Sequence, residues 1–228
     1  VTLRLLQEQG HDVTAFYLKI WLEDELAYMG SCPWEQDLSH AQAVCDQAGV
    51  PLEVVPLQKE YWDHVVSYTI AQIKAGRTPN PDIFCNKLIK FGFFLEKIDP
   101  SFEKIASGHY AHVCKEGDRY LLQSAPDPVK DQTYFLNALN QQQLAKTQFP
   151  LGELTKPEVR VLPEQAQFAN HAKKDSTGIC FIGERKFKDF LSQYLPAQPG
   201  VMQTPDGKVM GQHDGLMYYT LGQRQGLG

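Results

Sequence analysis

Short apolar runs alternate with longer segments of helical spacing in the first third of the chain. The runs, residues 12–20 and 52–57, are rich in the β-branched and aromatic residues that favour strands. Apolar residues recur at helical spacing over residues 37–48 and 60–75, and each of these segments stops at a glycine. Strands joined by helical crossovers lie parallel in one sheet, so the sequence predicts a doubly wound α/β fold.

Shorter elements are predicted in the middle of the chain. They are a strand over residues 104–107, a hairpin over residues 110–124, and a helix that begins at Thr155. The helix start is predicted by a capping box, in which Thr155 is followed three residues later by Glu158. Pro163 should then end or kink this helix, because proline lacks the N–H that the helix needs.

The chain of 228 residues is longer than a typical single domain. After a helix predicted over residues 186–195, residues 201–212 have the turn chemistry of a hairpin. This change from long helices to short strands predicts a first domain over residues 1–183 and the start of a small β-rich domain over residues 184–228.

Composition excludes several classes of protein. No apolar run reaches the length of a membrane span, and the net charge of −5 argues against a surface coated in positive potential. Five cysteines at irregular spacing, without a Cys-x-x-Cys pair, indicate a reducing compartment and no structural zinc. Cys32, Cys45 and Cys114 have no activating neighbours and are assigned to packing. We expect no metal site built from the protein alone.

Cys85 follows a rigid stretch, residues 78–82, in which two prolines fix the backbone. Residues 86–97 have helical spacing, so Cys85 is predicted at a helix N-terminus, where the helix dipole and two nearby lysines lower a thiol pKa. Asp82, three residues earlier, can donate or accept a proton. The alternative is an inert, buried cysteine at the start of an amphipathic helix.

Cys180 lies between Gly178 and Gly183, in a segment too glycine-rich for an ordinary helix and too apolar for a solvated loop. Such a segment can swing a thiol toward a substrate. Basic residues exceed acidic residues by two over residues 173–189, which favours a thiolate and suits contact with phosphates. The alternative is a packed strand with a solvated basic flank.

Two further stretches are ambiguous when taken alone. The charged residues 130–134 enter an apolar stretch, as solvated helix starts commonly do, and His109 stands between Gly108 and Tyr110 at a strand end, where a histidine is more often structural.

Together these stretches resemble one family, the tRNA-specific 2-thiouridylases, which use ATP to replace the C2 oxygen of the wobble uridine by sulfur. No single stretch is specific, but their joint occurrence in this order is. The matching stretches cover nearly the whole chain and are residues 16–21, 76–82, 85–87, 89–92, 108–110, 130–132, 151–152, 174–176, 178–183 and 219–224.

The resemblance implies a pyrophosphate-loop fold of the adenine nucleotide alpha hydrolase type and a role for each matching position. Cys180 would carry the persulfide, and Cys85 would be the second catalytic thiol, able to form a disulfide with Cys180 as sulfur leaves. Asp82 would be the general acid and base. The remaining implied contacts are Asn80, Pro81 and Asp82 with the flipped uridine, His109, Lys130, Asp131 and Gln132 with tRNA, and Leu18 and Gly108 with ATP.

The implied chemistry agrees with these residue types. A uridine carbonyl is a poor electrophile, and adenylation turns its oxygen into a leaving group. A thiol of low pKa can then deliver sulfur to C2. The base must leave the stack for this, which costs little in a single-stranded loop.

The resemblance also implies binding partners, and it implies segments of the family that would precede and follow this sequence. We expect ATP with Mg²⁺, tRNAs of the Lys, Glu and Gln type, a sulfur-relay protein or cysteine desulfurase as donor, no membrane, and a location in the cytoplasm or an organelle. The family's glycine-rich pyrophosphate loop would precede Val1 and its β-barrel would follow Gly228. This stretch of chain by itself is therefore expected not to adenylate RNA.

Two other functions stay open from the sequence. One is a non-catalytic tRNA-binding or dithiol redox protein that uses the same thiols. The other, a pyrophosphate-loop ligase of the argininosuccinate or GMP synthetase type, is disfavoured because that chemistry does not need paired cysteines.

Overall fold

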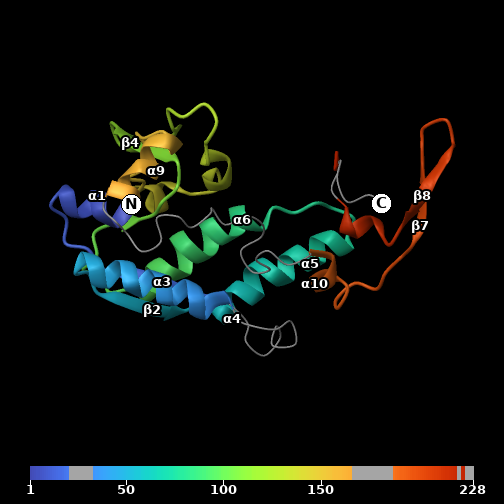
Figure 1. Cartoon of the computed structure of the whole chain (residues 1–228), viewed down its shortest axis with the longest axis horizontal. Helices are drawn as coiled ribbons and strands as arrows, with labels where there is room; N and C mark the ends of the chain where they lie inside the picture. The colour runs from blue at the N-terminus through green and yellow to red at the C-terminus, as the bar shows by residue number, and fades with distance from the viewer. Residues whose placement is uncertain (21–32, 166–186, 220–221, 224–228) are drawn as a thin grey trace. The chain divides into compact units, whose positions relative to one another are not determined.

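The computed structural model of the chain (Figure 1) describes residues 1–20, 33–165, 187–219 and 222–223. The chain divides into two compact units, and each unit is built from two separate stretches of sequence. The first unit is Val1–Tyr61 with Asp82–Asp175, and the second is Trp62–Pro81 with Ser176–Gly228. No helix in the described part of the chain is long and apolar enough to cross a membrane.

Parallel strand pairs form the centre of the first unit. Strand β1 (Ala15–Lys19) pairs with β2 (Leu52–Pro56), and α3 (Pro33–Ala48) connects them. A shorter parallel pair joins β3 (Ile105–Ala106) to β6 (Thr147–Gln148). The predicted α/β class with parallel strands is therefore confirmed.

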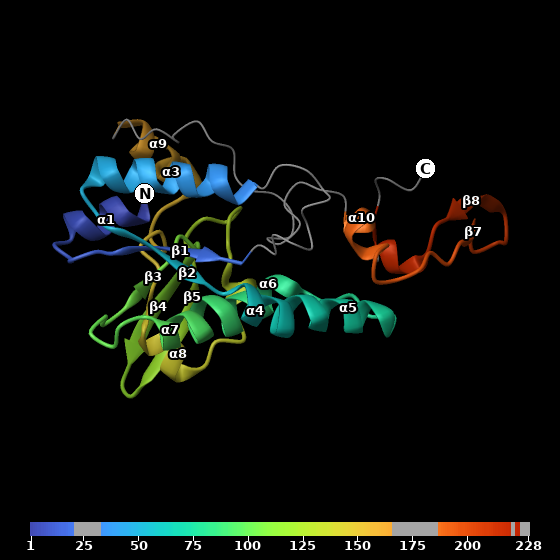
Figure 2. The same ribbon diagram turned by 90° about the horizontal axis from the view of Figure 1, so that it is seen from below.

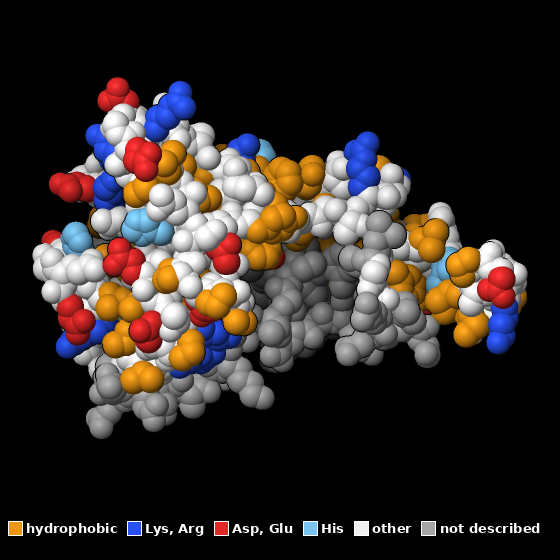
Figure 3. All heavy atoms as spheres, turned by 90° about the horizontal axis from the view of Figure 1, so that it is seen from above, with side chains coloured by type: hydrophobic (Ala, Val, Ile, Leu, Met, Phe, Trp, Pro, Cys, Tyr) orange, Lys and Arg blue, Asp and Glu red, His pale blue; other side chains and the backbone are white. Residues whose placement is uncertain are grey.

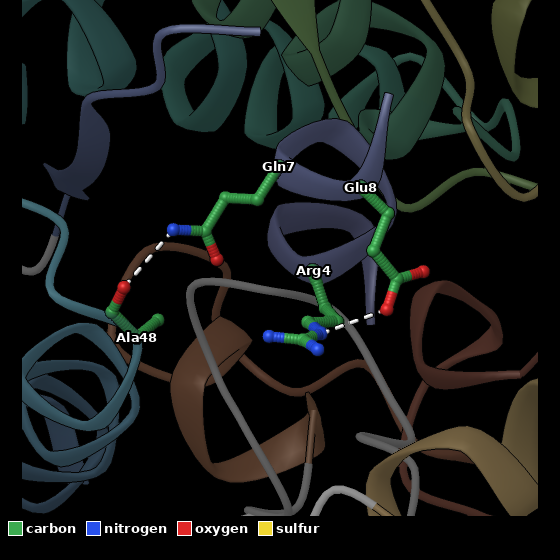
Figure 4. Close-up of polar contacts among 4 residues, drawn as sticks. All are labelled: Arg4, Gln7, Glu8 and Ala48. Atoms are coloured by element: carbon green, nitrogen blue, oxygen red, sulfur yellow. Dashed lines mark hydrogen bonds and ion pairs between the residues drawn. The ribbon is translucent and has the colours of Figure 1, made fainter. Parts of the chain in front are cut away.

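Helices cover both faces of β1 and β2 (Figure 2). Helices α1 (Thr2–Glu8) and α3 lie on one face, and α7 (Phe94–Lys97) lies on the other. The ring of Phe16, on β1, packs edge-on against Phe94 with 5.1 Å between centroids. On the first face, Gln7 of α1 donates a hydrogen bond of 2.9 Å to the carbonyl of Ala48, which satisfies an acceptor at the end of α3 (Figure 4).

The helix that carries Cys85 begins earlier than the sequence predicts. It runs through α6 (Pro81–Phe84), a π-helical stretch η3 (Cys85–Phe93) and α7, whereas the sequence analysis placed its start after Cys85. That prediction is wrong because Pro81 supports the start instead. Proline is favoured in a first helical turn, and the acidic Asp82 beside it complements the helix dipole.

The π-helical stretch is stabilised by a side chain from another helix. Gln143, on α8 (Gln141–Ala145), donates hydrogen bonds of 2.7 and 2.8 Å to the carbonyls of Lys87 and Phe91. A π-helix departs from the ordinary i to i−4 bonding and is common at functional sites. Gln143 thus satisfies backbone acceptors of the helix that holds Cys85.

A β-hairpin and a capped helix complete the first unit. Strands β4 (Ala111–Glu116) and β5 (Arg119–Ser124) are antiparallel, as predicted. One half of the predicted capping box is present: the Thr155 N–H donates a 2.7 Å hydrogen bond to the Glu158 carboxylate, to which the Thr155 hydroxyl also donates at 2.7 Å. Helix α9 (Lys156–Gln165) continues two residues past Pro163, so a helix end at that proline is wrong. A proline this near the end removes only one of the last hydrogen bonds.

Gly152 lies where any side chain would collide with the hairpin. A Cβ built there would stand 2.0 Å from the carbonyl oxygen of Ala111 and 3.0 Å from that of Phe149, and backbone cannot move aside cheaply. We expect Gly152→Ala to lower the free energy of unfolding by about 3 kcal/mol, measured by urea denaturation. Gly108→Ala is the control, because its nearest contact would be an ordinary 3.4 Å from the Thr2 hydroxyl. Equal stability of the two variants would contradict the expected clash.

The second unit combines a helix with small β elements. The helix is η2 (Trp62–Val66) followed by α5 (Ser67–Lys74), and the later stretch supplies α10 (Phe187–Leu191), β7 (Gly200–Gln203), β8 (Val209–His213) and η5 (Leu216–Tyr218). Strands β7 and β8 form the predicted hairpin. The rings of Trp62 and Tyr194 meet at 5.7 Å between centroids, which joins the two stretches of this unit.

Candidate functional site

Cys85 and Asp82 lie three residues apart on one helix, so they share a face of it. The Cys85 side chain is buried, with 3% of its surface exposed, while Asp82 is half-buried. Asn80, half-buried, and Pro81, buried, come directly before Asp82. The residues predicted to line the uridine pocket thus lie at the start of a helix, and the predicted thiol lies one turn further along the same helix.

The surroundings of Cys85 differ from those expected at a helix N-terminus. Because the helix begins at Pro81, the N–H groups that no helical carbonyl can accept belong to the first turn, before Cys85. The helix dipole acts less strongly one turn inside the helix. Half-buried Lys87 and Lys90, on the same helix, remain as sources of positive charge.

A buried amide links the Cys85 helix to a second predicted site segment. Asn86 has 3% of its surface exposed, and its Nδ2 donates a 3.0 Å hydrogen bond to the carbonyl of Phe135. Phe135 belongs to the 3₁₀ turn η4 (Thr133–Leu136), which directly follows Gln132. No role was predicted for Asn86, although its place beside Cys85 was the available signal in the sequence.

The two predicted tRNA-contacting segments meet in the structure. The N–H of Tyr110 donates a 3.0 Å hydrogen bond to Oε1 of Gln132, and the N–H of Gln132 donates one of 2.9 Å to the carbonyl of Tyr110. These bonds join the segment that carries His109 to the segment that carries Lys130 and Asp131. Folding therefore brings together residues more than twenty positions apart in the sequence.

Asp127 anchors the loop that carries Lys130, a role that the sequence analysis missed. Its Oδ1 accepts hydrogen bonds from the N–H groups of Val129 and Lys130 at 2.8 and 3.1 Å, and its Oδ2 accepts one of 2.7 Å from Lys156 at the start of α9. These hydrogen bonds, that from Lys156 foremost, hold the pKa of the Asp127 carboxyl below its usual value. In a sequence, an aspartate at the start of a short loop is only a weak indication of a turn.

Exposed apolar side chains flank the same loop. Val129 is 91% exposed and Tyr134 is 61% exposed, on either side of Lys130, Asp131 and Gln132. Exposed aromatic rings beside cations are typical of surfaces that stack on single-stranded bases.

His109 is held in an aromatic environment. Its ring lies 6.1 Å from that of Phe91 and 5.8 Å from that of Phe149, and its Nδ1 is 2.7 Å from the hydroxyl of Ser107. Burial, together with the nearby charge of Lys90, lowers the pKa of His109 to about 3. At neutral pH His109 is therefore uncharged.

This low pKa makes folding stability depend on acidity. Between about pH 6.5, the usual histidine pKa, and pH 3, the unfolded chain protonates His109 while the folded chain does not. Acid thus favours unfolding over this window, by at most about 1.4 kcal/mol per pH unit. We expect His109→Phe to reduce the loss of unfolding free energy between pH 7 and pH 4.5, measured by urea titration. His11→Phe, at an exposed position, is the control, and an unchanged pH dependence in His109→Phe would contradict the expectation.

The two residues predicted to touch ATP line one cavity in the first unit. The cavity has a volume of about 860 Å³ and lies between β1, which contributes Leu18, and the segment after β3, which contributes Gly108. Phe16 and Phe91 add aromatic surface, and Lys90 adds a cation. Its size and its mixed aromatic and polar lining suit a nucleotide base and sugar.

These residues fit the adenosine part of ATP better than the phosphates. Gly108 lines the cavity without a side chain, and a Cβ built there would make an ordinary contact of 3.4 Å with the Thr2 hydroxyl. Phosphates are commonly held by a glycine-rich loop of backbone N–H groups at a helix start. No such loop lines this cavity in the part of the chain that the structure describes.

Cys180, the predicted persulfide carrier, lies outside the described residues. So does Cys32, which the sequence analysis assigned to packing. Of the other cysteines given that role, Cys45 is buried, which raises its thiol pKa, and Cys114 is half-buried in β4. Among the described residues no group of three or more His, Cys, Asp or Glu side chains could hold a metal ion.

Comparison with known proteins matches nearly all of the chain. A family model described as tRNA methyl transferase HUP domain matches residues 1–184, and one described as tRNA methyl transferase PRC-barrel domain matches residues 188–228. Proteins called tRNA-specific 2-thiouridylase MnmA from Bacillus thuringiensis (strain Al Hakam), Bacillus anthracis and Bacillus mycoides (strain KBAB4) are each 55% identical to it over 229 residues.

These alignments cover 100% of the chain but 61% of each relative, so the chain spans less than two thirds of the length of the curated relatives it matches. The family resemblance inferred from the sequence is confirmed. The parallel strands of the first unit agree with the first family model. Because that model accounts for most of its residues, the chain belongs to the tRNA methyl transferase HUP-domain family, in which its similar relatives carry the name tRNA-specific 2-thiouridylase.

Proposed function

We propose that the complete protein is a tRNA 2-thiouridylase. It adenylates the C2 oxygen of the wobble uridine with ATP and Mg²⁺ and then replaces that oxygen with sulfur from a cysteine persulfide. Its tRNAs are of the Lys, Glu and Gln type, and its sulfur comes from a relay protein or a cysteine desulfurase. Residues 1–183 form the catalytic domain, and residues 184–228 begin a β-rich domain.

One structural observation supports this proposal in addition to the family match. Asn86, next to Cys85, is hydrogen-bonded to the turn that follows Gln132, and Gln132 is hydrogen-bonded to the residue that follows His109. Hydrogen bonds thus join the helix of the proposed thiol to both candidate tRNA segments. An inert structural cysteine would not require this convergence.

The charge of the surface is compatible with local recognition of RNA. On the face shown in Figure 3, basic side chains are interspersed with acidic ones. A protein of net charge −5 gains little from non-specific attraction to phosphates. Recognition therefore depends on positioned contacts such as Lys130 and on rings that stack on bases.

Each candidate residue has a distinct chemical task in this reaction. ATP, when bound, converts the C2 oxygen into a phosphate leaving group. Asn80 and Pro81 line the site of the extruded uridine, and Asp82 transfers the proton that the base gives up or takes back. Cys180 presents a persulfide whose outer sulfur attacks C2, and AMP leaves with the electron pair of the C–O bond.

Sulfur release from the enzyme uses the second thiol. The Cys85 thiolate attacks the inner sulfur of Cys180, the S–S bond to the transferred sulfur breaks, and that sulfur keeps the electron pair as 2-thiouridine. The resulting disulfide between Cys85 and Cys180 needs two electrons from an external thiol before the next turnover.

The proposal is tested by coupling sulfur transfer to ATP cleavage. The complete protein is incubated with tRNA, ATP and a radioactive sulfur donor, and we expect one AMP for each sulfur that reaches tRNA. A tRNA with cytidine at the wobble position is the control and should give neither product. Binding of tRNA without AMP or sulfur transfer would favour the alternative of a non-catalytic tRNA-binding or dithiol redox protein.

A further inference from the structure

The second unit contains a large cavity that shares Pro81 with the candidate site above. It has a volume of about 1090 Å³, enough for a nucleotide, and lies between the end of α5 and the segment around η5. The segment after α5 contributes Arg77, Thr78 and Pro79, and the facing wall contributes His213 and Tyr219. Neither Cys85 nor Asp82 lines it.

Among the described residues that line this cavity, the charged side chains are basic. Lys74 and Arg77 line it, both are exposed, and the lining residues that the structure describes include no aspartate or glutamate. The chain as a whole carries an excess of five negative charges, so an acid-free cavity with two cations is unusual for it. Arg77 is also oriented, because its Nη1 donates a 3.0 Å hydrogen bond to Oε1 of Gln72. These cations favour an anionic ligand.

Aromatic rings form the opposite wall and are held in place. The Tyr218 hydroxyl donates a 3.0 Å hydrogen bond to the carbonyl of Leu195, and the Lys188 ammonium lies 5.9 Å from the Tyr218 ring centroid. Half-buried Tyr219 packs edge-to-face with His213 at 6.2 Å. Rings that are already fixed lose little conformational entropy when a planar ligand stacks on them.

From these features we propose that the cavity binds a nucleotide of single-stranded RNA adjacent to the reacting uridine. Its phosphate meets Lys74 and Arg77, and its base stacks on Tyr219. Pro81 lines the cavity and also belongs to the proposed uridine pocket, so a neighbouring nucleotide can reach it. This inference rests on the proposed function, since it assigns a second contact to the same tRNA.

The electrostatic part is tested by affinity and its salt dependence. An anticodon stem-loop RNA is titrated with the complete protein and with a Lys74→Ala and Arg77→Ala double variant. We expect about tenfold weaker binding at 0.1 M salt, and a plot of log affinity against log salt whose slope is shallower by about 0.7, the value for one phosphate contact on a single strand. Lys208→Ala, an exposed lysine of the same unit, is the control. A double variant that behaves like this control would overturn the proposal.

The stacking part is tested with a fluorescent base. 2-Aminopurine replaces the nucleotide on the 3′ side of the wobble uridine, and its fluorescence should fall on binding because it stacks on Tyr219. Tyr219→Leu should remove this quenching and weaken binding about tenfold, whereas Tyr219→Phe keeps the ring and should retain both. Unchanged quenching in Tyr219→Leu would contradict the proposed stacking.

The same experiments separate this inference from the proposed function. Wild-type protein that binds the RNA with these dependences but transfers no sulfur would retain the nucleotide site and refute the thiouridylase. Sulfur transfer by wild-type protein, with RNA affinity unaffected by the double variant, would retain the thiouridylase and refute the nucleotide site.

Discussion

Cys85→Ser is expected to reduce sulfur transfer to tRNA by the complete protein by on the order of 10³-fold or more, with AMP formation retained in a first turnover. A hydroxyl cannot attack the inner sulfur of a persulfide, so sulfur remains attached to the enzyme. The measurement is a single-turnover assay that follows AMP and labelled tRNA in the same sample. Cys180→Ser should give the same loss of transfer, but without labelled sulfur held on the protein.

The matched control is Cys114→Ser. Cys114 is half-buried in β4 and is assigned to packing, so its replacement should leave sulfur transfer within about twofold of wild type. Loss of AMP formation in Cys85→Ser would place Cys85 in uridine activation instead, and full sulfur transfer by that variant would refute its role as a catalytic thiol.

Asp82→Asn is expected to lower the rate constant of the adenylation and transfer steps by about 10² to 10⁴-fold, the usual loss on removing a general acid or base. The amide keeps the size of the carboxylate but cannot carry the proton. Because the role proposed for Asp82 is proton transfer with the reacting base, kcat should fall while KM for tRNA changes little. The pH profile should also lose one of its limbs, which a purely structural role would not produce.

A suitable control for this variant is Asp118→Asn, an exposed aspartate in the turn between β4 and β5. It should leave kcat and KM unchanged. A rise in KM with kcat unchanged in Asp82→Asn would show that Asp82 only binds the substrate, contrary to its proposed role.

Much of the first unit could be predicted from local patterns. The strands around Phe16 and Val54 are short apolar runs, and their parallel pairing follows from the helix between them. The start of the Cys85 helix could not be placed in this way, because Pro81 is equally typical of a rigid loop and of a first helical turn. The π-helical stretch depends on Gln143, which is 52 to 56 residues away from the carbonyls it satisfies.

The candidate site shows the same division between local and distant information. Cys85 and Asp82 were identified from their own neighbours in the sequence. The hydrogen bonds of Asn86 with Phe135 and of Gln132 with Tyr110 join segments 49 and 22 residues apart, and only folding brings them together. The pKa of His109 is likewise lowered by its burial and by the charge of Lys90, and neither effect could be seen from the neighbours of this histidine in the sequence.

The central claim is that this protein replaces the C2 oxygen of a uridine with sulfur. Its most direct test is the identity of the modified nucleoside, obtained by digesting tRNA after reaction with the complete protein, ATP and a persulfide donor. Mass spectrometry should find 2-thiouridine at the wobble position with wild-type protein and unmodified uridine with Cys180→Ser. Unmodified uridine with both proteins, or a methylated uridine when a methyl donor is supplied, would contradict the claim.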